Sequence, residues 1–94
     1  MEIFIKEHET SGYAMATENE KRAGAMTYSV AGKELIIIDH TEVQPEYNGK
    51  NVGSQMLYKI VDMAREKNIK IIPLCPFAAA MFKKLDDIKD VLKT

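Results

Sequence analysis

Residues 41–54 read Thr41-Glu42-Val43-Gln44-Pro45-Glu46-Tyr47-Asn48-Gly49-Lys50-Asn51-Val52-Gly53-Ser54, and this stretch decides the fold of the 94-residue chain. A β-rich apolar run ends here, and Pro45 interrupts strand pairing. A loop that contains Gly49, Asn51 and Gly53 follows and leads into residues with helical spacing. The sequence therefore predicts a strand, a loop and a helix in direct succession.

Apolar residues after this loop recur three and four positions apart. They are Val52, Met56, Leu57, Ile60, Val61, Met63 and Ala64. This spacing predicts a helix over 51–67 with one apolar stripe, and Asn68 is a plausible C-terminal stop. Pro76 suits the first turn of a second helix over 77–84, and residues 86–92 can add a third, short one.

The flanking segments favour strands. Residues 3–5, 13–17, 25–30 and 34–43 are rich in β-formers and are separated by turn residues, which predicts an antiparallel meander. The apolar centre of 34–43 suggests burial on both faces. Residues 70–74 form a further strand, and the helical crossover before it makes that strand parallel to 35–43. We expect one α+β domain over 1–94, with a mostly antiparallel sheet and two or three helices.

Composition excludes several classes of protein. With 46% hydrophobic residues, 29% charged residues and a net charge of −1, the chain is neither disordered nor a typical nucleic-acid binder. Its one cysteine, Cys75, cannot form an intramolecular disulfide. His8 and His40 show no metal-ligand spacing, so no metal is expected. The chain start does not read as a signal peptide and no apolar run is long enough to span a membrane, so we expect a cytoplasmic protein without membrane contact.

The loop before the first helix has two interpretations. A helix N-terminus offers unpaired N–H groups and a positive dipole end, which suits a phosphate group. Glycines let the backbone approach the anion, Asn51 tolerates a positive φ, and Lys50 adds a cation. The alternative is a strand-to-helix turn that needs glycine for its geometry alone.

This stretch resembles motif A of the GCN5-related N-acetyltransferases, which reads Q/R-x-x-G-x-G/A after a V-x-P strand end. Val43 and Pro45 match the strand end, and Gly53 matches the last glycine. Asn48 stands where glutamine or arginine is usual, and Asn51 replaces the first motif glycine. Two further segments, His40-Thr41-Glu42-Val43 and Pro73-Leu74-Cys75-Pro76-Phe77, are similar to the small single-domain branch of the family. The resemblance covers residues 28–84.

The resemblance implies an acetyl-CoA-binding fold, with the pyrophosphate on the 48–54 loop. The pantetheine arm would lie along Glu42 and Val43, in a gap where the two parallel strands splay apart. The residues implied in cofactor binding are Glu42, Val43, Asn48, Gly49, Lys50, Asn51, Val52, Gly53, Ser54, Cys75, Phe77 and Phe82. The implied activity is acetyl transfer to an amine.

The second helix departs from the family pattern. Phe82 stands where a tyrosine usually protonates the departing CoA thiolate, and Cys75 stands at a usual asparagine. We also expect no counterpart of the N-terminal helix pair that builds the acceptor pocket, or of the strands that follow the second helix. A non-catalytic CoA-binding module or subunit is therefore the alternative function.

Three residues are candidates for catalysis. Cys75 can act as a nucleophile that relays the acetyl group, or it is a small buried apolar residue. Glu42 or His40 can be the base that deprotonates an amine, or each makes cross-strand hydrogen bonds. The acceptor is unidentified, and an open sheet edge permits a homodimer or a partner protein.

Overall fold

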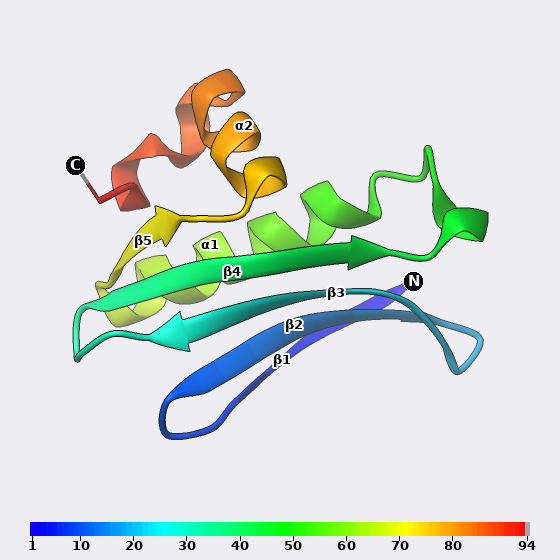
Figure 1. Ribbon diagram of the computed structural model, residues 1–94, viewed down its shortest axis with the longest axis horizontal. Coiled ribbons are helices and arrows are strands. Elements are labelled where there is room, and N and C mark those ends of the chain that lie inside the picture. The colour runs from blue at the N-terminus through cyan, green and yellow to red at the C-terminus, as the bar shows by residue number, and fades with distance from the viewer. Residues whose placement is uncertain (94) are drawn as a thin grey trace.

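Five strands and two α-helices make up the fold in the computed structural model, which describes residues 1–93 (Figure 1). The strands are β1 (Glu2–Glu7), β2 (Ser11–Glu18), β3 (Lys21–Val30), β4 (Leu35–Val43) and β5 (Lys70–Pro73). The helices are α1 (Val52–Lys67), α2 (Pro76–Lys84) and two 3-10 helices, η1 (Pro45–Tyr47) and η2 (Asp86–Val91). Each predicted element is present in the predicted order, so the α+β class is confirmed.

The sheet has the order β1-β2-β3-β4-β5. The first four strands are antiparallel, and β5 runs parallel to β4 from Leu35↔Lys70 to Ile38↔Pro73, as predicted. Pairing with β5 ends at Ile38, whereas β4 continues to Val43. Figure 1 shows β4 extending well past the end of β5. The two parallel strands therefore diverge, and the second half of β4 is paired on its β3 side.

The turn before β3 is tighter than the sequence indicated. The predicted third strand starts at residue 25, whereas β3 starts at Lys21. Asn19 and Glu20 both have positive φ, at 50° and 67°, and Glu18 pairs with Lys21. Two left-handed residues close a hairpin whose twist matches the flanking strands. Residues 21–24, which lie outside the strand predicted from the sequence, thus belong to β3.

The helices bury one face of the sheet. Ile36 and Ile38 of β4 are almost completely buried, together with Met56 and Ile60 of α1. Ile37, on the other face of β4, is only half-buried. The expectation that β4 is buried on both faces is therefore wrong, because the helices pack against the face that carries Ile36. Within residues 1–93, none of the helices has the length and apolar character needed to cross a membrane.

A β-bulge at Asp39 reverses the alternation of β4. Ile38 pairs with Tyr28 of β3, and His40 pairs with Thr27, so Asp39 is the extra residue. Without the bulge, His40 would share a face with Ile38. With it, Thr41 pairs with buried Met26 and faces the helices, whereas His40 lies on the open face.

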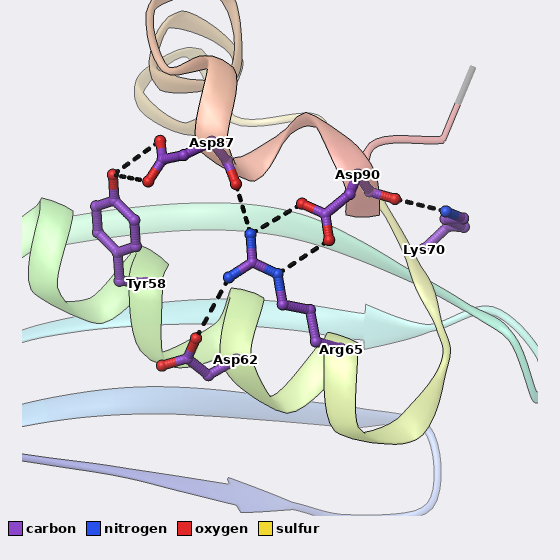
Figure 2. Close-up of polar contacts among 6 residues, drawn as sticks. All are labelled: Tyr58, Asp62, Arg65, Lys70, Asp87 and Asp90. Carbon is purple, nitrogen blue, oxygen red and sulfur yellow. Dashed lines mark hydrogen bonds and ion pairs between the residues drawn. The ribbon is translucent and has the colours of Figure 1, made fainter.

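Polar contacts hold η2 against α1 (Figure 2). Arg65 of α1 donates two hydrogen bonds to the Asp90 carboxylate, at 2.9 and 2.8 Å. Tyr58, two turns earlier, donates to the carboxylate of Asp87 at 3.0 Å. Lys70 of β5 donates to the backbone oxygen of Asp90. These contacts fix the segment after α2, and with it the position of α2 beside α1.

Candidate functional site

The N-terminus of α1 is left without a side-chain cap. Its N-cap residue, Asn51, has a left-handed backbone with φ 59° and makes no capping hydrogen bond through its side chain. The first turn of the helix contains no acidic residue. The free N–H groups and the positive end of the helix dipole therefore face outward. Such a helix start can bind an anion, and the left-handed Asn51 is what the sequence predicted.

A cavity of about 320 Å³ lies directly in front of this helix start. It is lined by Val43, Tyr47, Asn48, Gly49, Asn51, Val52, Gly53, Ser54 and Phe77. All of these except Tyr47 were predicted from the sequence to bind a cofactor. The structure thus brings the end of β4, the loop before α1 and the start of α2 together around this cavity.

The Phe77 ring lies directly against Gly53. A Cβ atom at this position would lie 2.6 Å from Cζ of Phe77, which is far inside van der Waals contact. Phe77 lies in the first turn of α2, and the residue is 37% exposed. The ring packs on the backbone of α1 and forms one wall of the cavity. The close contact at Gly53 is therefore made by this chain's own side chain.

Cys75 lies between β4 and α2, at the point where β4 and β5 diverge. Its N–H and the N–H of Leu74 both donate to the carbonyl oxygen of Ile38, each at 3.0 Å. Its Sγ accepts a hydrogen bond from the N–H of Ala78 at 3.4 Å and so caps α2. Sγ also lies 3.1 Å from Oγ1 of Thr41. The residue is only 4% exposed.

The two candidate bases lie on the open face of the sheet. Glu42 is exposed and forms an ion pair with Arg22 at 2.8 Å. His40 is exposed and pairs with Thr27 across the sheet. Because the bulge turns Thr41 toward the helices, His40 and Glu42 point away from the helix side of β4, where Thr41 contacts Cys75. The structure does not bring them into hydrogen-bond contact with the thiol.

Two other predicted binding residues have their own contacts. The Lys50 ammonium group lies 5.5 Å from the centre of the Tyr47 ring, in a cation–π arrangement. Phe82 is 2% exposed and belongs to the core. A direct contact of Phe82 with a cofactor stays a prediction.

A wider groove of about 710 Å³ runs along α1 and shares Asn51 and Ser54 with the first cavity. Its other walls come from the start of β1 and the end of α2, including Ile3, Met81 and Lys84. Tyr58 lines this groove, and partial desolvation together with the hydrogen bond to Asp87 raises its pKa. The loop cavity therefore continues along the helix.

Sequence reasoning missed two residues of this region. Thr41 was overlooked because strict alternation along β4 places it on the face opposite Ile38, and a bulge leaves no clear mark in an apolar run. Tyr47 lines the cavity but is not among the residues predicted to bind a cofactor. Its position in the loop that connects the strand to α1 was the available signal.

Comparison with known proteins gives one family. A model of the GCN5-related N-acetyl-transferases matches residues 12–91. The solution structure of a GCN5-like protein from Staphylococcus aureus is 39% identical over 96% of this chain and 87% of that chain, with a TM-score of 0.71. No protein of curated function matches the sequence.

Two more distant structures share the fold. The ribosomal-protein-alanine N-acetyltransferase of Brucella melitensis biovar Abortus is 16% identical over 83% of this chain, with a TM-score of 0.71. A protein of Clostridium acetobutylicum described as a predicted acetyltransferase, solved with acetyl-CoA, is 20% identical over 80% of this chain, with a TM-score of 0.63. This chain spans 62% and 56% of their lengths. With the match over residues 12–91, the chain belongs to the family of GCN5-related N-acetyltransferases.

Proposed function

We propose that this protein transfers an acetyl group from acetyl-CoA to an amine. The observation that carries the proposal is the uncapped N-terminus of α1, which opens onto a cavity built by the predicted loop. A pyrophosphate group carries the negative charge that such a helix start stabilises. The backbone N–H groups from Asn51 to Ser54 would hold it, with Asn48 and Gly49 at the rim.

The unpaired half of β4 suits the pantetheine arm. The N–H of Gln44 donates to the carbonyl oxygen of Ala23 on β3 at 2.8 Å. Successive peptide groups of a strand point to opposite edges, so the N–H of Val43 points to the edge that β5 leaves unpaired. Val43 also lines the cavity. An amide of the arm can therefore pair with the Val43 backbone, and the arm then leads along β4 toward Cys75.

Cys75 is the proposed acetyl relay. Its thiolate would attack the carbonyl carbon of the thioester, a new C–S bond would form, and the bond to the CoA sulfur would break. CoA leaves as a thiolate that takes a proton from water. One thioester replaces another, so this step does not need the acid that Phe82 lacks.

An amine would then attack the acetyl-Cys75 carbonyl group. The C–S bond to Cys75 breaks, an amide forms, and the thiolate is restored. His40 or Glu42 would take the ammonium proton through water, because both lie on the open face of β4 and point away from the thiol. In this arrangement the acceptor approaches from the open face, whereas the phosphate loop lies on the helix side.

Intact mass spectrometry tests the relay. Incubation with acetyl-CoA alone is expected to add one acetyl group, which hydroxylamine removes because it is a thioester. The Cys75→Ala variant is expected to stay unmodified. An acetyl group that resists hydroxylamine, or that persists in Cys75→Ala, would exclude Cys75 as its site.

Two observations favour the alternative function, a module that binds CoA without catalysis. Cys75 is almost fully buried, and Phe82 supplies no hydroxyl group. Calorimetric titration with acetyl-CoA, combined with the mass measurement, separates the two functions. Tight binding without acetylation of Cys75, and without transfer to any amine in a panel, would support the module.

A further inference from the structure

We propose that the hydroxyl group of Thr41 is a positioning group that donates a hydrogen bond to the Cys75 thiolate. The inference deepens the proposed function, because it assigns a residue that prepares the relay thiol. It depends on the contact between Thr41 Oγ1 and Cys75 Sγ, which are 3.1 Å apart.

The local backbone directs this contact. The bulge at Asp39 brings Thr41 onto the same face of β4 as Ile38, although the two residues are an odd number of positions apart. Thr41 consequently faces α2 across the gap between β4 and β5. A regular strand would turn the hydroxyl group toward the open face and leave the thiol without it.

Sγ has two polar neighbours within hydrogen-bond distance among the described residues. They are the Thr41 hydroxyl group on β4 and the N–H of Ala78 on α2, at 3.4 Å. The ionisable neighbours on β4, His40 and Glu42, lie on the opposite face of the strand. α2 contributes its positive dipole end, and its lysines, Lys83 and Lys84, lie in its last turn.

The direction of the hydrogen bond between Thr41 and Cys75 depends on whether the sulfur carries a proton. A neutral thiol can donate to Thr41 or accept from it, but a thiolate has no hydrogen, so the hydroxyl group must then be the donor. Hydrogen bonds to the charged form of a group favour that form. The Thr41 hydroxyl group therefore stabilises the nucleophilic state and also orients its lone pairs.

The test uses the single cysteine of the chain as its own probe. Thiolate absorbance near 240 nm is followed against pH in Thr41→Val, Thr41→Ser and the unchanged protein. The same titration in the matching Cys75→Ala background is subtracted to remove the tyrosines. We expect Thr41→Val to move the thiolate titration up by about one pH unit or more. Thr41→Ser should restore most of the shift, because it keeps the hydroxyl group.

Three further measurements keep the result decisive. Thr41→Ala provides a second variant without a hydroxyl group if Thr41→Val does not fold. Thr17→Val on β2 is the matched control and should leave the titration unchanged. Iodoacetamide labelling at neutral pH should slow about tenfold in Thr41→Val.

Two results would overturn the assignment. One is an unchanged titration in a folded variant without the hydroxyl group. The other is an equal shift in Thr41→Ser and Thr41→Val, which would make the effect one of packing. All of these measurements are made without acetyl-CoA. They can therefore contradict the role of Thr41 while acetyl transfer is still observed, or support it in a protein that transfers no acetyl group.

Discussion

The two α-helices of this protein start in opposite ways. Asn51 starts α1 with a left-handed backbone and no side-chain hydrogen bond, and the helix opens onto a cavity. Cys75 starts α2 with an extended backbone, and its Sγ accepts the N–H of Ala78. Pro76 at the first position of α2 has no N–H to satisfy. One helix start is thus available to an outside anion, and the other is closed by the chain's own thiol.

This difference separates two tasks that both use a helix dipole. At α1 the unpaired N–H groups can stabilise the charge of a bound molecule. At α2 the same field acts on the sulfur of Cys75, which Thr41 also contacts. Phe77 connects the two starts, because it belongs to α2 and packs on Gly53 of α1. Changes at one start should therefore affect binding, and changes at the other should affect chemistry.

The largest effect is expected from Cys75→Ser. Serine is a good N-cap residue, so it can keep the hydrogen bond to Ala78 and the thermal stability of the protein. Its hydroxyl group stays protonated and is a weak nucleophile without a base. We expect acetyl transfer to fall by roughly a hundredfold or more, while calorimetry shows acetyl-CoA affinity within a few-fold of the unchanged protein. Full transfer by the serine variant would return the chemistry to direct attack by the amine.

The second-largest effect, a loss of acetyl-CoA affinity, is expected from Gly53→Leu at the start of α1. The new side chain must displace the Phe77 ring and enter the cavity, so acetyl-CoA affinity should fall by about tenfold or more, about 1.4 kcal/mol. Adding Phe77→Ala in the same protein makes room for the leucine. If affinity recovers in the double variant, the loss came from the displaced ring. If it does not, the leucine itself blocks the approach of the anion. Unchanged affinity in folded Gly53→Leu would remove this loop from the site.

The sequence predicted the elements of the fold and most of the cavity lining, for a physical reason. The helix over 52–67 has a strong apolar period, and Asn51 and Asn68 both adopt the left-handed backbone that their side chains tolerate. The loop over residues 48–54 is continuous in sequence, so its residues come together through local geometry. The relation between His40, Glu42 and Cys75 was harder to predict, because it depends on a long-range pairing and on one bulge. Asp39 reverses which side chains face the thiol, and composition carries no clear sign of that reversal.

A charge placed at the open helix start should have opposite effects on stability and on binding. Ser54 occupies the third position of α1 and lines the cavity. In Ser54→Glu the carboxylate interacts favourably with the helix dipole, which should stabilise the fold by about 0.5 kcal/mol. The same carboxylate repels an anion, so acetyl-CoA affinity should fall several-fold. Ser54→Gln, of similar size but uncharged, is the matched control. Chemical denaturation measures the free energy of unfolding, and calorimetry measures acetyl-CoA affinity. If Ser54→Glu raised both or lowered both, the start of α1 would not be the anion-binding site.

The smallest effect is expected far from both helix starts, at the contact between η2 and α1. The hydrogen bonds from Arg65 lower the pKa of Asp90, and the nearby charge of Arg65 acts in the same direction, against the effect of desolvation. A carboxylate whose pKa is lowered on folding adds stability above its ordinary pKa, and this contribution is lost as the pH falls through the lowered value. Asp90→Asn should therefore melt at a slightly lower temperature than the unchanged protein at neutral pH, and the difference should disappear in acid. The effect is small because both side chains are well exposed. Acetyl-CoA affinity should not change, because this contact lies near the C-terminal end of α1, far from the uncapped helix start. A loss of affinity in Asp90→Asn would contradict this expectation. It would show that the position of α2 beside α1 controls binding at the start of α1.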